Sequence, residues 1–254
     1  MKKIVVFCCL VLLCACARQP VLQTSPENRA VLEQRWQKFA ALGPVEKAEP
    51  YRLQLSLRFG TEGDTRRVTA LFWGNSQRQL RLDVMAGVGT TVAKILEDGQ
   101  HFLVYSPSAS KAYFVQGASK SELQVGVPVP FNLVHLADLL NGRYASVFGK
   151  QFENTAFTAD GKAVYDLQGQ PGGRVTLNEQ GLPVEWQEQA NGKGWSMEIL
   201  YSDDPTPLPR RLNLAHSNGK RAIVLIKERE KVSQPFTKEQ MALPLPEEDP
   251  LLPL

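Results

Sequence analysis

The chain has 254 residues, of which 43% are hydrophobic and 22% are charged, and its formal net charge is +3. Lys2 and Lys3 supply two of those positive charges, so the rest of the chain is almost neutral. This balance argues against nucleic acid or a strongly anionic macromolecule as a partner. The length that follows the leader described next suits a single all-β domain.

The first 15 residues have the pattern of a signal peptide. Two lysines precede an unbroken apolar run over residues 4–15, which is about half the roughly 20 residues needed to span a bilayer. The run ends in Leu13-Cys14-Ala15-Cys16, which looks like a lipobox. Small residues flank the bond to be cut, and a thiol follows it to accept lipid. We therefore expect cleavage before Cys16 and a lipid anchor on that cysteine.

The cysteine positions decide between this interpretation and an ordinary secretory leader. All four cysteines lie in or at the end of the leader, so the mature chain keeps one, and disulfides are not expected. Ala17 follows Cys16, where an Asp is the signal for retention in the inner membrane. We expect the cell outer membrane, with the domain facing the periplasm. The four cysteines are Cys8, Cys9, Cys14 and Cys16.

A lipidated tether over residues 16–24 is expected to lead into a helix. Ser25 is a good N-cap and Pro26 suits the first helical position. Apolar residues follow at helical spacing, among them Leu32 and Trp36, and Gly43 is expected to close the helix in a left-handed cap.

Strict alternation of apolar and polar residues then predicts strands. Tyr51 to Phe59 is the clearest example, because every second residue is apolar. Asp98-Gly99 predicts a type I′ turn between two of the strands. Successive short strands of this kind indicate an antiparallel meander. The predicted strands are 51–59, 66–73, 79–84, 90–97, 101–106 and 111–116.

The alternation stops at Val127-Pro128-Val129-Pro130, which cannot be a central strand because proline has no N–H for the ladder. A short, very apolar helix over 131–140 is predicted next, closed by Gly142. Strands then resume, and Asn218-Gly219 is a hairpin signal. The further predicted strands are 162–168, 173–178, 183–189, 194–201, 210–216 and 221–229.

About eleven or twelve strands with two helices predict a mainly β fold, in the form of an incomplete antiparallel barrel. The helices would cover its mouth or concave side. We expect one domain over residues 25–247, followed by an extended Pro-rich tail over 248–254.

Three stretches of the chain resemble one known family. They are the Trp36 helix followed directly by strand 51–59, the strand–apolar loop–strand over 72–91, and the Pro-rich entry at 127–130 to a helix ending in Leu139-Leu140-Asn141-Gly142. Together they resemble the LolA/LolB superfamily of lipoprotein carriers and receptors, most closely its LolB-like lipoproteins. The sequence departs from the family pattern at Ala86-Gly87, where the loop would carry Pro, and at Val88, where it would carry Leu.

The resemblance implies a barrel with a helical lid over an apolar cavity that takes acyl chains. The cargo would be acyl chains or lipoproteins, and a periplasmic carrier protein is a candidate partner. Met85 and Val88 would form a loop that contacts acyl chains or the membrane. The candidate lid residues are Phe131, Val134, Leu136, Leu139 and Leu140, and the candidate cavity-lining residues are Trp36, Leu55, Leu57, Phe72, Trp73 and Leu82.

Each of these assignments has a purely structural alternative. The helix over 131–140 fits an ordinary buried helix on a sheet equally well, and tryptophans in a β domain are usually core residues. Glycines around Val88 let the chain turn sharply, but an apolar residue in such a turn can also fold back onto the sheet.

Enzyme activity, a cofactor and a metal site are not expected. His101, His135 and His216 are far apart in the sequence, and no nucleophile, zinc or phosphate-loop motif is present. His135 and Asp138 fit a polar helix edge better than a catalytic dyad. The alternative to lipid handling is a lipid-anchored interaction module that binds a protein partner of the cell envelope.

The leader gives a direct prediction. Cys16→Ser should block both acylation and cleavage by the lipoprotein-specific peptidase, because the nucleophile for lipidation is lost. Metabolic labelling with an alkyne fatty acid measures this, and normal labelling of the variant would contradict the lipid anchor.

Overall fold

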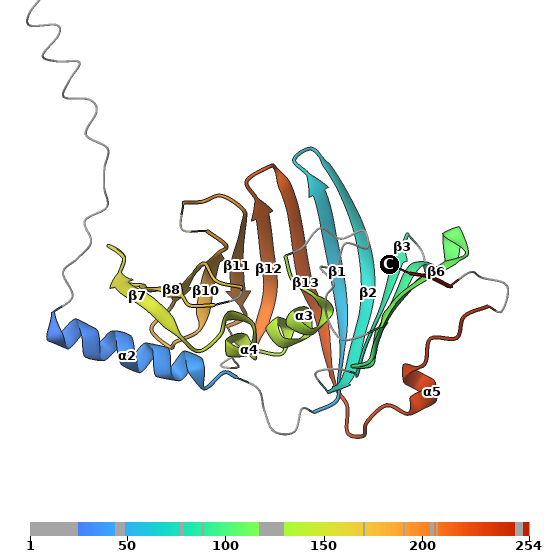
Figure 1. The fold of residues 1–254 in the computed structure, drawn as a ribbon, viewed down its shortest axis with the longest axis horizontal. Coiled ribbons are helices and arrows are strands. Elements are labelled where there is room, and N and C mark those ends of the chain that lie inside the picture. The colour runs from blue at the N-terminus through green and yellow to red at the C-terminus, as the bar shows by residue number, and fades with distance from the viewer. Residues whose placement is uncertain are drawn as a thin grey trace, which may run out of the picture.

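In the described part of the chain, fourteen strands form one continuous sheet in the order β14-β6-β5-β4-β3-β2-β1-β13-β12-β11-β10-β9-β8-β7. This computed structural model describes residues 25–43, 49–76, 79–87, 89–116, 130–169, 171–189, 191–203, 206, 208–246 and 251–253. The end strands β14 and β7 do not pair with each other, so the curved sheet stays open (Figure 1). The predicted class, a mainly β incomplete barrel with covering helices, is confirmed.

Two antiparallel meanders make up the sheet, and they join where β1 pairs with β13. Three predicted strands, 90–97, 101–106 and 111–116, coincide with β4, β5 and β6. The first meander contains β1 (Tyr51–Thr61), β2 (Asp64–Ser76), β3 (Gln79–Ala86), β4 (Thr90–Glu97), β5 (His101–Ser106) and β6 (Lys111–Gln116). The second contains β7 (Phe152–Phe157), β8 (Ala163–Leu167), β9 (Arg174–Leu177), β10 (Pro183–Gln187), β11 (Trp195–Tyr201), β12 (Pro209–His216) and β13 (Lys220–Lys231).

The strand order forces one long crossing. β6 lies next to one edge of the sheet and β7 forms the other edge, so the chain between them must travel the width of the sheet. This connection carries α3 (Leu133–Leu140) and α4 (Tyr144–Phe148), which lie across the middle of the sheet (Figure 1). The predicted apolar helix is confirmed, and Gly142 ends it with a positive φ of 74°.

The N-terminal helix α2 (Pro26–Ala40) begins as predicted, with the Ser25 side chain accepting a hydrogen bond from the Asn28 N–H. Its predicted end is wrong, because the C-cap is Ala41 and Gly43 has no positive φ. A Cβ at Gly43 would meet the flexible end of the Lys150 side chain, with Cε at 3.0 Å.

The Asp98-Gly99 turn is also not the predicted type I′, because only Gly99 has a positive φ. Instead the Asp98 carboxylate accepts hydrogen bonds from the N–H groups of Gln100 at 2.8 Å and His101 at 2.7 Å. A type I′ turn would need a positive φ at Asp98 as well as at Gly99. Here the hydrogen bonds to the Asp98 side chain stabilise the turn instead.

Five short elements were not predicted: β7, the 3-10 helix η2 (Pro107–Ala109), α4, α5 (Lys238–Met241) and β14 (Leu251–Pro253). Each is either too short to show a period or, like β7, a polar edge strand without clean alternation. The tail returns along the outer face, where Leu243 packs with Tyr105 and Ala112. β14 then pairs in parallel with β6, so the tail protects that edge of the sheet.

The leader, the tether and the segment Val127-Pro128-Val129 lie outside the described residues. Among the described residues, no helix combines the length and the hydropathy that a membrane span requires.

Glycine geometry gives a matched test of the fold. Gly173 has a φ of 86°, and a Cβ there would overlap the backbone oxygens of Gln187 and Glu188, whereas Gly192 at φ 74° faces open space. We expect Gly173→Ala to lower the free energy of unfolding by about 3 kcal/mol, and Gly192→Ala by only the left-handed cost of about 1–2 kcal/mol. Urea unfolding measures both, and equal losses would contradict the strand pairing of β9 with β10.

Candidate functional site

The inner face of the sheet is apolar along its central strands. Period-two alternation sends every second residue inward, and these residues are almost fully buried. Such a face must be covered, because each exposed apolar area costs free energy in water. On β1 to β3 and β11 to β13 the buried inner residues include Leu53, Leu55, Leu57, Val68, Ala70, Phe72, Leu80, Leu82, Val84, Met197, Ile199, Leu212, Leu214, Ala222, Val224 and Ile226.

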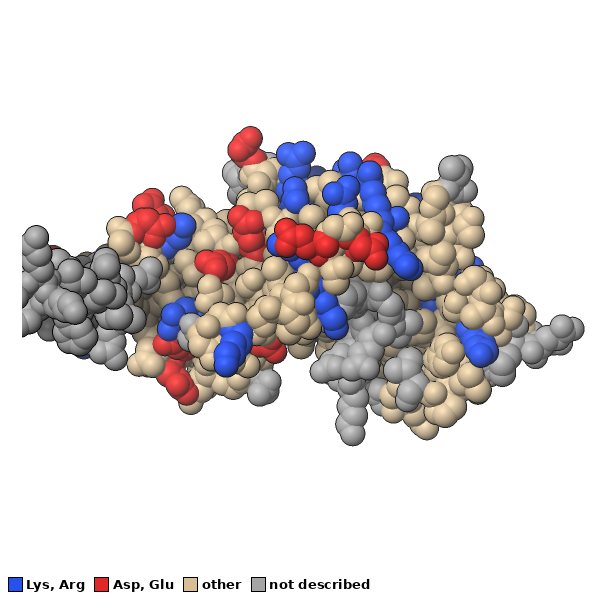
Figure 2. All heavy atoms as spheres, turned by 90° about the horizontal axis from the view of Figure 1, so that it is seen from above, with Lys and Arg blue, Asp and Glu red and all other residues tan. Residues whose placement is uncertain are grey.

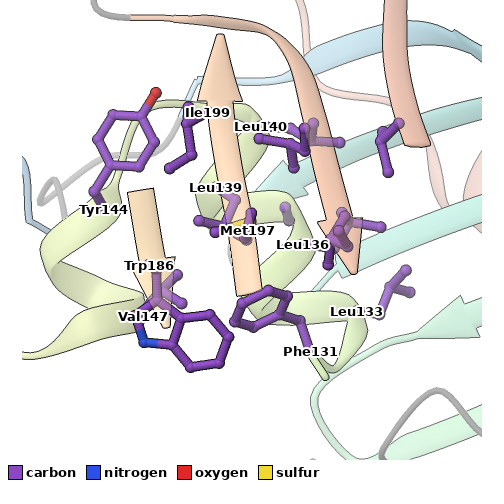
Figure 3. Close-up of a cluster of buried hydrophobic side chains, with 14 of the residues drawn as sticks. Phe131, Leu133, Leu136, Leu139, Leu140, Tyr144, Val147, Trp186, Met197 and Ile199 are labelled. Atoms are coloured by element: carbon purple, nitrogen blue, oxygen red, sulfur yellow. The ribbon is translucent and has the colours of Figure 1, made fainter. Parts of the chain in front are cut away.

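The cover over part of this face is the α3–α4 pair. Six of the eight residues of α3 are buried. Figure 3 shows Leu136, Leu139 and Leu140 directed toward the sheet, with Leu139 beside Met197 of β11. Just before the helix, the Phe131 ring lies 5.4 Å from that of Trp186. The helix therefore sits on the sheet through interlocking apolar side chains.

The candidate lid residues all lie at this contact. Phe131, Leu136, Leu139 and Leu140 are buried, and Val134 is half-buried against the same core. In this conformation α3 is the buried helix on a sheet that the sequence also allowed. Its described backbone hydrogen bonds stay within residues 132–143, so side chains alone join it to the strands.

The candidate cavity-lining residues separate into three places. Leu55, Leu57, Phe72 and Leu82 share the inner face with α3. Trp36 lies further along, between α2 and the strands β7 and β8, with its ring 4.8 Å from that of Phe152.

Trp73 does not line the inner face, and its assignment to a cavity is corrected. Strand alternation places it on the opposite face from Phe72. There the Arg81 guanidinium stacks on its ring at 5.1 Å and also bonds the backbone at α5.

The loop after β3 is partly described. Met85 is half-buried and pairs with Thr69, so it belongs to the outer face. Gly87 and Gly89 have positive φ angles of 57° and 84°, and a Cβ at either would meet open space. Val88 between them lies outside the described residues, so its contact role stays a prediction.

A feature that the sequence did not reveal lies at the rim of the inner face. Immediately after α3, the Arg143 Nε donates to Asp138 Oδ1 at 2.6 Å, and both side chains are more than nine-tenths buried. Asp138 is thus part of an ion pair on the inner face and not the polar helix edge that we expected. Burial lowers the pKa of the neighbouring His135, and Asp138 partly opposes that shift.

The second unforeseen feature is a β-bulge in β13. The bulge shifts the register of β1 with β13 between Gln54 and Leu55. Before the bulge in β13, the side chains of Ala222, Val224 and Ile226 point inward. After it, Arg229 lies opposite the inward Leu53. An extra residue in one strand of a pair reverses the faces of all that follow. No sequence signal marked this bulge.

The bulge explains why the inward side chains of β13 change from apolar to cationic along the strand. Arg229 and Lys231 now share the face of Tyr51 and Leu53, whereas simple alternation from Val224 and Ile226 would turn them outward. Burial lowers the pKa of Arg229, and its Nη2 donates to the Pro209 carbonyl at 2.7 Å. The rim therefore gathers cationic groups that the linear pattern assigns to the outer surface.

Charges of both signs are mixed over two hairpins at the other end of the strands. Seen from above in Figure 2, over the hairpins that join β1 to β2 and β12 to β13, basic and acidic side chains lie side by side. Arg221 pairs there with Glu62 at 3.0 Å. Among the described residues, no three His, Cys, Asp or Glu side chains gather as a metal site would require.

An open antiparallel sheet whose inner face is covered by helices defines the class of fold, and proteins of known structure share this fold. A LolA superfamily protein from Nitrosomonas europaea superimposes with a TM-score of 0.56, at 12% sequence identity, over 82% of this chain and 98% of its own. A DUF1329 family protein from Desulfovibrio piger gives a TM-score of 0.54, at 7% identity, over 80% of this chain and 93% of its own. No family model and no curated protein matches the sequence.

The buried ion pair gives a testable prediction. Arg143→Leu should lower the free energy of unfolding by about 3–5 kcal/mol, because it leaves the buried Asp138 without its cation. Combining it with Asp138→Leu should recover much of that loss, as measured by urea unfolding.

The control is the exposed pair of Arg52 with Glu230, at 3.3 Å. Arg52→Leu should cost about 0–1 kcal/mol. A double variant no more stable than Arg143→Leu alone would show that the two charges are not coupled.

Proposed function

We propose that this protein is a lipid-anchored protein of the cell envelope that binds acyl chains on the inner face of its sheet. The observation that carries the proposal is the cover of that face. It is an apolar helix pair in which α3 meets the apolar strands through side chains, while α4 is anchored by the Ala145 N–H, which donates to the Leu42 carbonyl. Acyl chains can replace the apolar contacts of α3, because such contacts have no preferred geometry.

The energetics favour a carrier of this kind. Each CH₂ moved out of water contributes about 0.8 kcal/mol, so lipid chains need a shield to cross an aqueous space. In this proposal the α3–α4 pair is a lid that fills the inner face when no chain is bound. The core leucines and Phe72 would then line the space that opens.

The proposed cellular location rests on the leader and the fold together. Lipid on Cys16 would hold the domain at the outer membrane, facing the periplasm. The likeness in fold to a LolA superfamily protein supports a role in lipoprotein localisation, with lipoproteins as cargo delivered by a periplasmic carrier. Met85 and Val88 remain the proposed loop that touches acyl chains or the bilayer.

Trp186 offers a built-in reporter of the proposed site. It is 1% exposed and its ring lies 5.4 Å from that of Phe131 beside α3. A chain that starts at Ala17 keeps every described element. We expect dibromostearate, which quenches tryptophan by contact, to quench its fluorescence saturably.

Two variants locate the quenching. Trp186→Phe should remove most of it, whereas Trp73→Phe, which changes a tryptophan on the outer face, should leave it in place. An absence of saturable quenching would reject acyl-chain binding and favour the alternative, a lipid-anchored interaction module. Quenching that is lost with Trp73 instead would place the lipid on the outer face.

A further inference from the structure

A cavity of about 820 Å³ opens at the rim of the inner face, between the end of α3 and the lower ends of β1 and β13 in Figure 1. Its volume lies in the range of small-molecule sites. Leu53 and Leu208 give it apolar wall, and Arg143, Arg229 and Lys231 bring positive charge to it. It therefore joins an apolar surface to a cationic rim.

Arg143 is the innermost of these cations. Its side chain is buried, and one edge of the guanidinium is taken by Asp138. Its Nη2 has no hydrogen-bond partner among the described residues, and neither has the buried hydroxyl of Tyr51. Unpaired buried donors are costly, and a guanidinium can bind two partners through its separate edges. Two buried donors without a partner thus belong to residues that line one cavity.

Carboxylates close to the cavity do not neutralise all of this charge. Asp138 is paired with Arg143. Glu230 is paired with Arg52, and both lie on the face of the sheet opposite to that of Leu53. Glu49 also lines the cavity but is exposed to solvent. Arg229 is half-buried, which disfavours its charged form, so a bound anion would stabilise it.

We propose that this rim cavity binds the anionic head of an amphiphile, a carboxylate or phosphate, whose hydrocarbon chain lies on the apolar inner face. The inference rests on the proposed acyl-chain function and specifies its ligand class. The Arg143 Nη2 and the Tyr51 hydroxyl donate to the anion's oxygens. Arg229 and Lys231, which the bulge turns inward, attract the anion's oxygens electrostatically from β13.

The test compares two ligands that have the same hydrocarbon tail and different head groups. Dansyl-undecanoic acid and its methyl ester carry the same tail, and at about pH 8 only the acid is charged. Fluorescence titration of the chain from Ala17 onward should give tighter binding of the acid by at least about tenfold, the size of one charge-assisted hydrogen bond.

Three variants and one control place the preference on the rim. Arg229→Gln and Lys231→Gln should each reduce the ratio of acid to ester affinity several-fold. Arg143→Gln combined with Asp138→Asn should reduce it too, without leaving a buried carboxylate unpaired. The matched control, Arg58→Gln, removes an exposed cation from the outer side of β1, away from the cavity, and should preserve the ratio.

The outcomes are distinguishable. Equal binding of acid and ester would overturn the anion site and leave the proposed function standing, whereas binding of neither would reject both. A preference that survives all three variants would place the anion elsewhere and overturn the inference. Displacement of the probe by equimolar butyrate would show that the anion alone suffices, and would overturn the amphiphile. Competition by dodecyl phosphate or by laurate would support the site and tell the two heads apart.

Discussion

The need to cover one apolar face governs this structure. The alternating residues of a single sheet give it an apolar inner face that must be shielded from water, and the described part of the chain forms no second sheet to pack against it. The connection from β6 to β7 has to cross the width of the sheet, and it carries α3, of whose eight residues six are buried. Topology therefore requires the crossing, and hydrophobic burial decides that α3 lies on the inner face.

The two faces of the sheet are closed by different means. Outside, the tail from α5 to β14 covers β3 to β6 and pairs with the edge strand, so backbone hydrogen bonds fix it. Inside, α3 meets the strands through side chains. Hydrogen bonds hold the outer cover in one register, whereas the inner cover rests on apolar contacts, which have no preferred geometry. The proposed lipid-binding role depends on this asymmetry.

The rim shows how a local irregularity changes chemistry. One extra residue in β13 turns Arg229 and Lys231 to the inner side of the sheet at the rim, where Arg143 pairs with Asp138. Arg143 and Asp138 are buried charges, which are stable only with partners. The transition from apolar wall to cationic edge matches the shape of an amphiphile, with the chain inside and the head at the rim.

The sequence by itself determined the elements with a clear period or cap: the Ser25 helix start, β4 to β6, the apolar helix after the proline run, and the open-barrel class. These depend on local geometry that each segment carries within itself. Only the tertiary structure decided that Trp73 faces outward, that the tail pairs with β6, and that Arg143, Arg229 and Tyr51 meet. A bulge reverses a strand's faces without changing its composition, and contacts between residues far apart in the chain leave no local pattern to read.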